Sequence, residues 1–398
     1  MEMTISELLP KDLVEEILCR VPATSLKRLR STCKAWNCLF KNDRRFASKH
    51  FDKSAKQFLP LLLRTDYMIF PISVKLHGNS PSLVFKSELI EPDSKNSAVR
   101  FEITRVFHCD GLLLCSSQID ASRVLVWNPL TGETRWIRTG DFHKEKEGRS
   151  YDLGYYHKSS CNKSYKMLSY YRGSKYFEIY DFNSDSWRIL DDMIGDVSFG
   201  YSELSVSLKG NTYWLARDVN ETPRTISLLK FDFSTEKSVP VPLPYQSLQS
   251  RRFEASSLSV VGEEKLSVLL QRDRSSKTEI WVTNKIDDTT NAVSWSKVLA
   301  LDLSPDPQIW YDASFLLEEE KKVVISCDRC ERLIGGGDNN NIYLDKAKDM
   351  VYIVGEDNVV TQVECGVDEM EGCWPVILNY VPSLVQIKRA GGKRKRGD

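Results

Sequence analysis

The sequence predicts a mainly β protein: a degenerate β-propeller preceded by a small all-α module. Apolar residues recur in steps of three and four within about the first fifty residues, which is the spacing of short amphipathic helices. From Phe58 to Ile387, short runs rich in Val, Ile, Tyr, Phe and Trp alternate with Gly, Asn, Asp and Ser, as in strands joined by turns. A strand–turn–strand pattern recurs through this second part, which indicates repeated sheets.

Composition indicates a soluble globular chain with one small and one large part. At 398 residues it exceeds a typical single domain, and its contents of 41% hydrophobic and 28% charged residues are ordinary. Lys and Arg together number 55, as do Asp and Glu, so the net charge is zero, whereas a general nucleic-acid binder carries a basic surplus. No run approaches the ~18 apolar residues of a membrane span. We therefore expect neither a nucleic acid nor a membrane as a partner.

The N-terminal sequence also bears on location. MEMTISELLPKDL is acidic and lacks the apolar core of a signal peptide. The ten cysteines are scattered, and several stand in apolar contexts, such as Cys19, Cys115 and Cys327. Without a secretory signal we expect reduced thiols and a location in the nucleus and/or the cytoplasm.

The predicted helical module has more apolar surface than so few residues can bury. Pro10 and Pro22 cut it into pieces too short to be stable alone, so we expect it to need a partner surface. Its regularly spaced residues are Leu9, Leu13, Ile17, Leu18, Val21, Leu26, Leu29, Cys33, Trp36 and Leu39.

Residues 1–51 resemble an F-box. The resemblance rests on Leu9-Pro10, Asp12-Leu13, Glu16-Ile17-Leu18, Val21-Pro22, Leu26, Leu29-Arg30, Cys33-Lys34 and Trp36, which fall in that order at near-standard spacing. It implies binding to the Skp-type adaptor of a ubiquitin ligase and, through the adaptor, to a cullin. The adaptor-binding residues it implies are Leu9, Pro10, Leu13, Ile17, Leu18, Val21, Pro22, Leu26, Leu29 and Trp36. The alternative is an ordinary helical cap packed on its own domain, and the pattern leaves open which of these residues face outward.

Residues 52–57 form a polar link to the β domain, which we place at 58–387. Within it, an apolar strand with an aromatic residue is followed by a polar turn and a second strand. The copies are roughly 50 residues apart, the size of kelch propeller blades, so we predict a degenerate kelch-like β-propeller with these aromatics in the blade cores. The aromatics are Trp127, Tyr180, Phe231, Trp281 and Tyr343. The blade number stays open, and residues 58–91 supply either one more blade or the closing strands.

The β domain carries a second resemblance. CDGLLLC, VWNPLTGE, YDLGYY, YDFNSDSWR, LKGNTYWLA and LLKFDFSTE are similar to segments of the F-box-associated interaction domain of plants. The part beyond Trp310 departs from this pattern most. Together the two resemblances imply a substrate receptor in which the β domain holds a target protein.

Motifs of catalysis or metal binding are weak. Cys327 and Cys330 form a CxxC, but zinc needs two more ligands, and the nearest, Cys365 and Cys373, have an unusual spacing; a pair of buried or edge thiols is the alternative. No His array, no GxSxG turn and no phosphate-binding loop at the glycines 335–337 completes a known site. We therefore predict a non-catalytic protein with no catalytic residue, metal or cofactor.

Polar stretches between strands are the candidates for target recognition, because propellers usually bind partners through loops at one rim. They are Gly140 to Ser150, His157 to Ser164, Arg217 to Arg224 and Tyr245 to Phe253. Plain solvated loops are the alternative, and the substrate-binding residues stay unknown.

Residues 388–398 form a basic tail. Lys393, Arg394, Lys395 and Arg396 are either a nuclear import signal or part of a solubilising tail.

Three functions follow from these features. The first is the substrate-recognition subunit of a Skp-cullin-F-box ubiquitin ligase, which promotes degradation of an unidentified target. The second is an adaptor-bound scaffold, or a module that binds a glycan or another small ligand without a role in ubiquitination. The third, a propeller enzyme, lacks a convergent set of reactive side chains.

Overall fold

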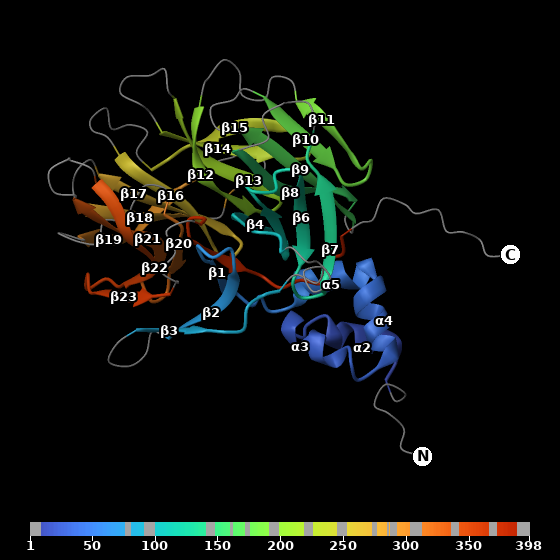
Figure 1. Cartoon of the computed structure of the whole chain (residues 1–398). Coiled ribbons are helices and arrows are strands. Elements are labelled where there is room, and N and C mark those ends of the chain that lie inside the picture. The colour runs from blue at the N-terminus through green and yellow to red at the C-terminus, as the bar shows by residue number, and fades with distance from the viewer. Residues whose placement is uncertain are drawn as a thin grey trace.

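The computed structural model describes residues 9–75, 81–90, 100–140, 148–159, 162–171, 176–190, 199–218, 226–244, 253–272, 277–284, 286, 293–302, 313–335, 342–365 and 372–387. Within these residues four helices precede 24 strands, which form six four-stranded sheets (Figure 1). The predicted propeller with a helical N-terminus is therefore confirmed, and it has six blades. Among the described helices, none has both the length and the hydropathy that a membrane span requires.

The helices form one small module. They are α2 (Lys11–Leu18), α3 (Ala23–Leu29), α4 (Lys34–Asn42) and α5 (Arg44–Lys53). Pro10 and Pro22 stand directly before α2 and α3, where a missing N–H costs nothing. The Asp43 carboxylate caps α5 by accepting hydrogen bonds from the N–H groups of Arg45 (2.9 Å) and Phe46 (3.1 Å). None of these helices exceeds ten residues, so packing rather than intrinsic propensity holds them.

Each blade is one antiparallel sheet. Blade 1 contains β24 (Val376–Tyr380), β1 (Leu59–Leu63), β2 (Ile69–Lys75) and β3 (Ser82–Phe85). Blade 2 contains β4 (Arg105–Cys109), β5 (Leu112–Ser116), β6 (Arg123–Asn128) and β7 (Glu133–Arg138), and blade 3 contains β8 (Arg149–Ser159), β9 (Asn162–Tyr171), β10 (Phe177–Asp181) and β11 (Ser186–Leu190). Blade 4 contains β12 (Phe199–Leu208), β13 (Asn211–Asp218), β14 (Ile226–Asp232) and β15 (Lys237–Val241). Blade 5 contains β16 (Phe253–Val261), β17 (Lys265–Arg272), β18 (Lys277–Thr283) and β19 (Trp295–Asp302), and blade 6 contains β20 (Phe315–Glu318), β21 (Val323–Gly335), β22 (Ile342–Val354) and β23 (Val360–Glu364).

The ring is closed by the two ends of the β domain. Strand β24 pairs with β1, with Leu61 opposite Leu378 and Leu63 opposite Val376. Blade 1 therefore takes its innermost strand from the C-terminal end of the domain and the other three from its beginning. Residues 58–91 thus supply both a blade and the closure, which answers the choice that the sequence left open.

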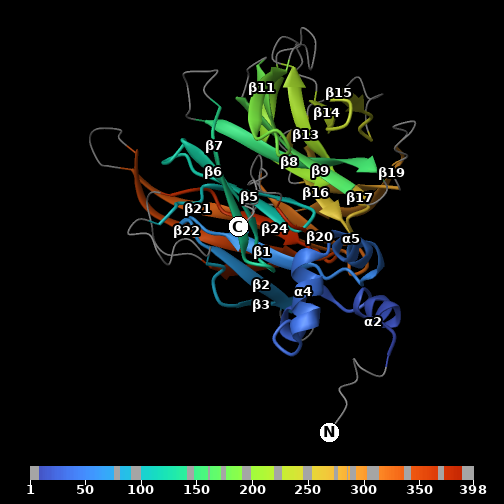
Figure 2. The same ribbon diagram turned by 90° about the vertical axis from the view of Figure 1, so that its right-hand side faces the viewer.

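The propeller has two faces that differ in what they carry. The innermost strands β4, β8, β12, β16, β20 and β24 each contact the next around the ring. In every blade, the turn from the first to the second strand and the turn from the third to the fourth lie on one face, since adjacent strands are antiparallel. We call this the helix face, because β1 begins there and the helical module lies beside it (Figures 1 and 2). The connections between blades and between second and third strands lie on the opposite, far face.

The repeated sequence pattern marks the turn at the end of each third strand. Asn128 and Asp232 accept hydrogen bonds through their side-chain oxygens from N–H groups two and three residues later, and Asp181 from the N–H of Asn183. The aromatics just before them, Trp127, Tyr180 and Phe231, are buried between blades, as predicted.

The two later aromatics of the pattern fit it less well. Trp281 packs against the blade core but is only half-buried, with the Lys297 ammonium 5.6 Å from the centre of its ring. The side chain of Tyr343 lies outside the described residues. This is where the repeat had already become irregular in the sequence.

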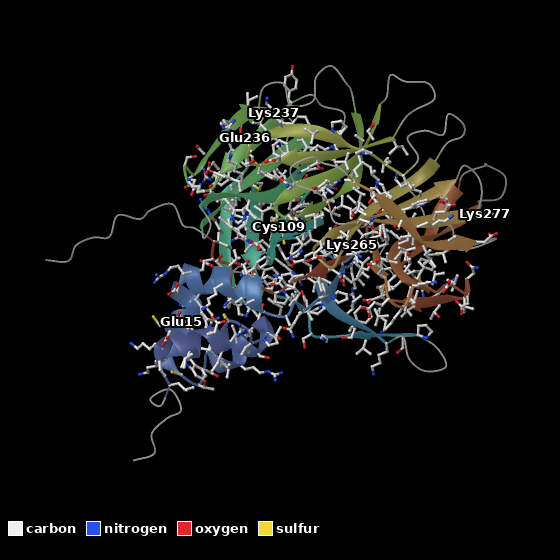
Figure 3. All side chains as sticks on the ribbon, turned by 180° about the vertical axis from the view of Figure 1, so that it is seen from behind. Glu15, Cys109, Glu236, Lys237, Lys265 and Lys277 are labelled. Atoms are coloured by element: carbon white, nitrogen blue, oxygen red, sulfur yellow. The ribbon has the colours of Figure 1, made fainter. Side chains whose placement is uncertain are left out.

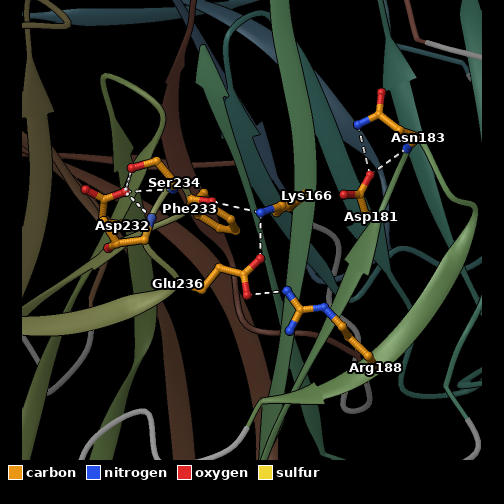
Figure 4. A network of polar contacts seen from close by, with 9 residues as sticks. Lys166, Asp181, Asn183, Arg188, Asp232, Phe233, Ser234 and Glu236 are labelled. Atoms are coloured by element: carbon orange, nitrogen blue, oxygen red, sulfur yellow. Dashed lines mark hydrogen bonds and ion pairs between the residues drawn. The ribbon is translucent and has the colours of Figure 1, made fainter. Parts of the chain in front are cut away.

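Ion pairs join neighbouring blades on the helix face. Lys166 of blade 3 lies 2.5 Å from the carboxylate of Glu236 in blade 4 and donates to the carbonyl oxygen of Phe233 at 3.1 Å (Figure 4). Arg188 of blade 3 pairs with the same carboxylate, so one acidic group holds two blade-3 cations. Lys166 is buried and Arg188 exposed, so the Lys166 contact is the more shielded from salt.

The interior of the ring contains a buried carboxylate, which gives a pH prediction. The hydroxyl groups of Ser205 (2.5 Å) and Tyr170 (3.2 Å) donate to Asp152, yet burial raises the pKa of this carboxyl from 3.8 to about 6. Because the folded state holds this proton more tightly than the unfolded state, the Asp152 contribution to stability falls as pH rises from about 4 to 6 and is level above that. We expect Asp152→Asn to lack this fall.

The measurement is urea unfolding of wild type and Asp152→Asn between about pH 4.5 and 7.5. The free energy of unfolding of the variant should rise by roughly 2 kcal/mol relative to wild type across this range, at 1.36 kcal/mol per pKa unit. Burial lowers the pKa of His108 to about 4, but this group is common to both proteins and cancels in the comparison. A difference that does not change with pH would contradict the raised pKa.

Candidate functional site

The predicted adaptor-binding residues separate into an exposed and a buried set. Leu9, Leu13 and Ile17 expose 37%, 49% and 55% of their surface, and Pro10 beside them is exposed as well. Leu13 and Ile17 are four residues apart on α2 and therefore lie on one face of the helix. We call Leu9, Leu13 and Ile17 the apolar stripe; it is an exposed apolar surface of the module.

Leu18 and Leu26 belong to the core of the module, which settles for these two residues the orientation that the sequence left open. They are 4% and 0% exposed and pack with Phe40 and Phe46. The other four predicted residues lie at intermediate burial: Val21, Pro22, Leu29 and Trp36. Apolar residues spaced by three and four occur in the exposed set and in the buried set, because a short helix can be apolar both on the side that packs and on the side that stays exposed.

Glu16 anchors α2 to α5 beside the apolar stripe. Its carboxylate lies 2.7 Å from the Lys49 ammonium, 2.8 Å from that of Lys53 and 2.7 Å from the Arg20 guanidinium. The hydrogen bonds from Lys49 and Lys53 lower the pKa of Glu16 to about 2, so it stays charged at any physiological pH. The two helices are thereby fixed in register at the surface.

His50 ties α5 to the segment before α3. It is 1% exposed, and its Nε2 donates to the carbonyl oxygen of Val21 at 2.7 Å. Burial lowers the pKa of this imidazole. It is therefore a packed residue of the module.

The module is joined to the propeller by a packed interface. Leu130, in the turn between β6 and β7, and Leu384, after β24, lie in the same apolar cluster as Leu18 and Leu26. The side-chain amide of Gln386 donates to the carbonyl oxygen of Lys41 at 2.7 Å. The module thus packs on its own domain, as the alternative reading of the pattern had it, and still leaves the apolar stripe exposed.

The polar link between the two parts is held at the centre of the helix face. Two ammonium groups lie close to the centre of the Phe51 ring: that of Lys56 at 3.2 Å and that of Lys163, from blade 3, at 4.0 Å. Lys163 lies 2.8 Å from Asp110 of blade 2, and Lys56 lies 3.5 Å from Glu263 of blade 5. We call these five residues the linker clamp. It attaches the link to three blades, so the module and the propeller keep one orientation.

A cavity of about 310 Å³ lies beneath the clamp, where the inner strands end. Its walls are mostly apolar and include Val106, Leu258, Phe315 and Val376. His108 accepts hydrogen bonds through Nε2 from the N–H groups of Gly111 (3.2 Å) and Val381 (3.4 Å), so it holds the C-terminal segment in place.

Metal-ligating groups do not gather anywhere in the described part of the chain: no three His, Cys, Asp or Glu side chains come together there. Cys327 and Cys330 stand three residues apart on β21, one buried and one exposed, so they point to opposite sides of the sheet. Cys327 contacts the Ser314 hydroxyl, Cys365 donates to the carbonyl oxygen of Asp349, and Cys373 to that of Arg64. Each of these three thiols thus has an oxygen partner in the protein.

The predicted recognition stretches divide between the faces. Residues 148–150, 217–218 and 253, the described ends of three of them, lie at strand ends on the far face; their central parts, 141–147, 219–224 and 245–252, lie outside the described residues. The stretch from His157 to Ser164 instead joins the first two strands of blade 3 and lies on the helix face, beside the clamp. The basic residues Lys393 to Arg396 and glycines 336 and 337 are also outside the described residues.

Exposed apolar side chains on the far face were missed in the sequence. Ile90, Ile119, Tyr176 and Trp374 expose 51%, 64%, 61% and 55% of their surface on connections of that face. No repeat marks them, and the only sequence signal was a large apolar residue inside a polar connection.

Known proteins of similar sequence share both parts of the chain. The F-box domain family matches residues 7–48, and the F-box associated beta propeller domain family matches residues 60–387. "F-box protein ETP2" of Arabidopsis thaliana is 74% identical over 400 residues, covering 99% of each chain, and "F-box protein ETP1" of the same plant is 51% identical over 425 residues, covering 100% of each. Among solved structures, YjhT has a TM-score of 0.39 at 11% identity over 69% of this chain and 86% of its own.

Proposed function

Because the chain belongs to the F-box proteins with an F-box-associated β-propeller, we propose that it is the substrate-recognition subunit of a Skp-cullin-F-box ubiquitin ligase. The helical module binds a Skp-type adaptor and, through it, a cullin. The propeller holds a target protein, which is then ubiquitinated and degraded by the proteasome. The chain itself carries out no bond chemistry in this role.

The observation that carries the proposal is the exposed apolar stripe. Leu9, Leu13 and Ile17 remain exposed after the module has packed on the propeller, and an exposed apolar row on a packed helix is typical of a protein-binding surface. The far face remains available to a target while the adaptor occupies the module. Figure 3 shows the distance between the two regions: Glu15 marks the module and Lys277 the opposite edge of the propeller.

The receptor acts by proximity and orientation. Binding to one scaffold raises the concentration of the target's lysines near the ubiquitin-conjugating enzyme. The linker clamp supports this role, because a fixed module holds a bound target at a constant distance from the adaptor.

The cavity beneath the clamp favours the second candidate, an adaptor-bound scaffold or glycan or small-ligand binding module without a role in ubiquitination. Its volume of about 310 Å³ is at the lower end for a ligand site. In that case a ligand would bind without changing the lifetime of any protein.

One purification separates the candidates. The full chain and its Leu13→Glu/Ile17→Glu variant are used as bait in plant tissue with the proteasome inhibited. We expect adaptor and cullin with wild type alone, and a target with both baits that carries ubiquitin only with wild type. If wild type recovers neither adaptor nor cullin, the proposal fails. If wild type recovers both, but no captured protein carries more ubiquitin with wild type than with the variant, the scaffold is the better account.

We further propose that the protein acts in the nucleus and/or the cytoplasm, with Lys393 to Arg396 as a nuclear import signal. The motivation is the basic run itself. Replacement of these four residues by Ala should deplete a fluorescent fusion from the nucleus. An unchanged distribution would leave the run as a solubilising tail.

A further inference from the structure

Two exposed apolar side chains on the far face adjoin one core cluster between blades 1 and 2. Ile90 follows Leu89 and Trp374 follows Cys373, and both Leu89 and Cys373 pack in the cluster that contains Phe101 and Ile103. An exposed tryptophan is unusual, because a large aromatic surface in contact with water is costly unless a partner covers it.

Ile119 is connected to the same place by hydrogen bonds. The Cys373 thiol lies 3.8 Å from the carbonyl oxygen of Ile103. The next residue, Thr104, accepts a hydrogen bond from the N–H of Gln118 at 3.0 Å, and Ile119 follows directly. Ile90, Ile119 and Trp374 therefore stand on three connections that are linked through this core cluster, Ile103 and Thr104; we call Ile90, Ile119 and Trp374 the far-face patch.

Three arginines on far-face connections of blades 1 and 2 are each paired with a carboxylate. Arg64 pairs with Asp66, Arg100 with Glu88, and Arg123 with Asp120 at 2.8 Å. Two of them also rest on aromatic rings: the Arg64 guanidinium lies 4.6 Å from the centre of the Phe70 ring, and that of Arg123 lies 4.4 Å from the Trp136 ring. An acidic or phosphorylated segment would have to break such pairs to be held, whereas apolar side chains would cover the patch without disturbing them.

We propose that the far-face patch is the docking site for the target and that it receives a segment presenting large apolar side chains. The proposal rests on the substrate-receptor function and specifies its target class. Trp374 supplies the central contact, since tryptophan dominates binding energy at protein interfaces, and Ile90 and Ile119 complete the apolar surface. The paired arginines form a polar rim that contributes little net charge, so binding depends weakly on salt.

The test uses short random peptides displayed on phage, selected on the full-length chain bound to a Skp-type adaptor. Selected peptides are then measured against wild type, Trp374→Ala/Ile119→Ala, and Val359→Ala. Val359 is a matched control, because it is 60% exposed but lies in the turn between β22 and β23 on the helix face. All three positions are exposed, so we expect every variant to fold.

We expect the selected peptides to be rich in apolar residues and to bind the double variant about 30-fold more weakly than wild type. Their affinity should fall less than about twofold with Val359→Ala. It should also fall less than about threefold when salt is raised from about 50 to 500 mM. Acidic or phosphomimetic peptides that salt releases would overturn the apolar assignment. Apolar peptides that bind the double variant as well as wild type, or no enrichment on wild type over that variant, would overturn the location. Peptide binding requires no ubiquitin transfer, so failure here is distinct from failure of the ligase function.

Discussion

Leu13→Glu combined with Ile17→Glu is expected to lower the affinity for a purified Skp-type adaptor by at least about 100-fold without reducing the stability of the chain. Both side chains are about half exposed and outside the module core, so the free protein loses little apolar burial. In the complex the two carboxylates would be buried without a partner, which costs several kcal/mol. Titration calorimetry with the adaptor measures the affinity, and urea unfolding checks the fold.

Leu26→Ala is the matched contrast, because Leu26 is apolar, in the same module and fully buried. Its loss should lower the free energy of unfolding of the module by about 2–5 kcal/mol through the cavity that it leaves. Adaptor affinity should fall only to the extent that the module unfolds. Retained adaptor binding by the stripe variant would refute the contact assignment of Leu13 and Ile17.

Glu178→Gln is expected to lower the free energy of unfolding by roughly 3 kcal/mol or more. Arg149 and Glu178 of blade 3 lie 3.0 Å apart, and their side chains are 1% and 3% exposed. Arg149 also donates to the Tyr171 hydroxyl at 2.7 Å and the Gly140 carbonyl at 3.2 Å, so its position is fixed by neutral groups that cannot balance its charge. Removal of the carboxylate charge leaves a buried cation that cannot readily deprotonate.

The double variant Arg149→Met/Glu178→Leu separates the charge effect from packing. Buried ion pairs replaced by apolar residues of similar size are often neutral or stabilising, so we expect the double variant to be more stable than Glu178→Gln alone. Chemical unfolding followed by tryptophan fluorescence measures all three proteins. A double variant less stable than the single one would mean that hydrogen bonding and shape, rather than the lone charge, dominate at this site.

Local features of the sequence predicted most of the architecture. Prolines before α2 and α3 and apolar steps of three and four marked the module, and the turns at Asn128, Asp181 and Asp232 marked the blades, because each depends on residues within a few positions of one another. The resemblance to F-box proteins with an associated propeller domain is confirmed by the family matches.

Features that join distant residues could not be predicted. The pairing of Leu61 with Leu378, the clamp from Phe51 to Lys163 and the cluster beneath Trp374 connect segments that only the closed ring brings together. The separation of the exposed stripe from the core residues Leu18 and Leu26 also required the third dimension, since Ile17 and Leu18 are adjacent in sequence and opposite in burial. The number of blades could not be counted from the repeats, because blade 1 is completed by β24, which carries no repeat motif.

Closure by the last strand has a consequence for protein synthesis. The helices of the module lie within the first 53 residues, but β24 ends at Tyr380, so the ring cannot shut until the polypeptide through Tyr380 has left the ribosome. A message with a premature stop codon after the module would therefore give a product that has no closed ring and lacks Leu130 and Leu384, which pack in the core of the module. Such a truncation would thus remove the closed ring and weaken the packing of the helical module at the same time.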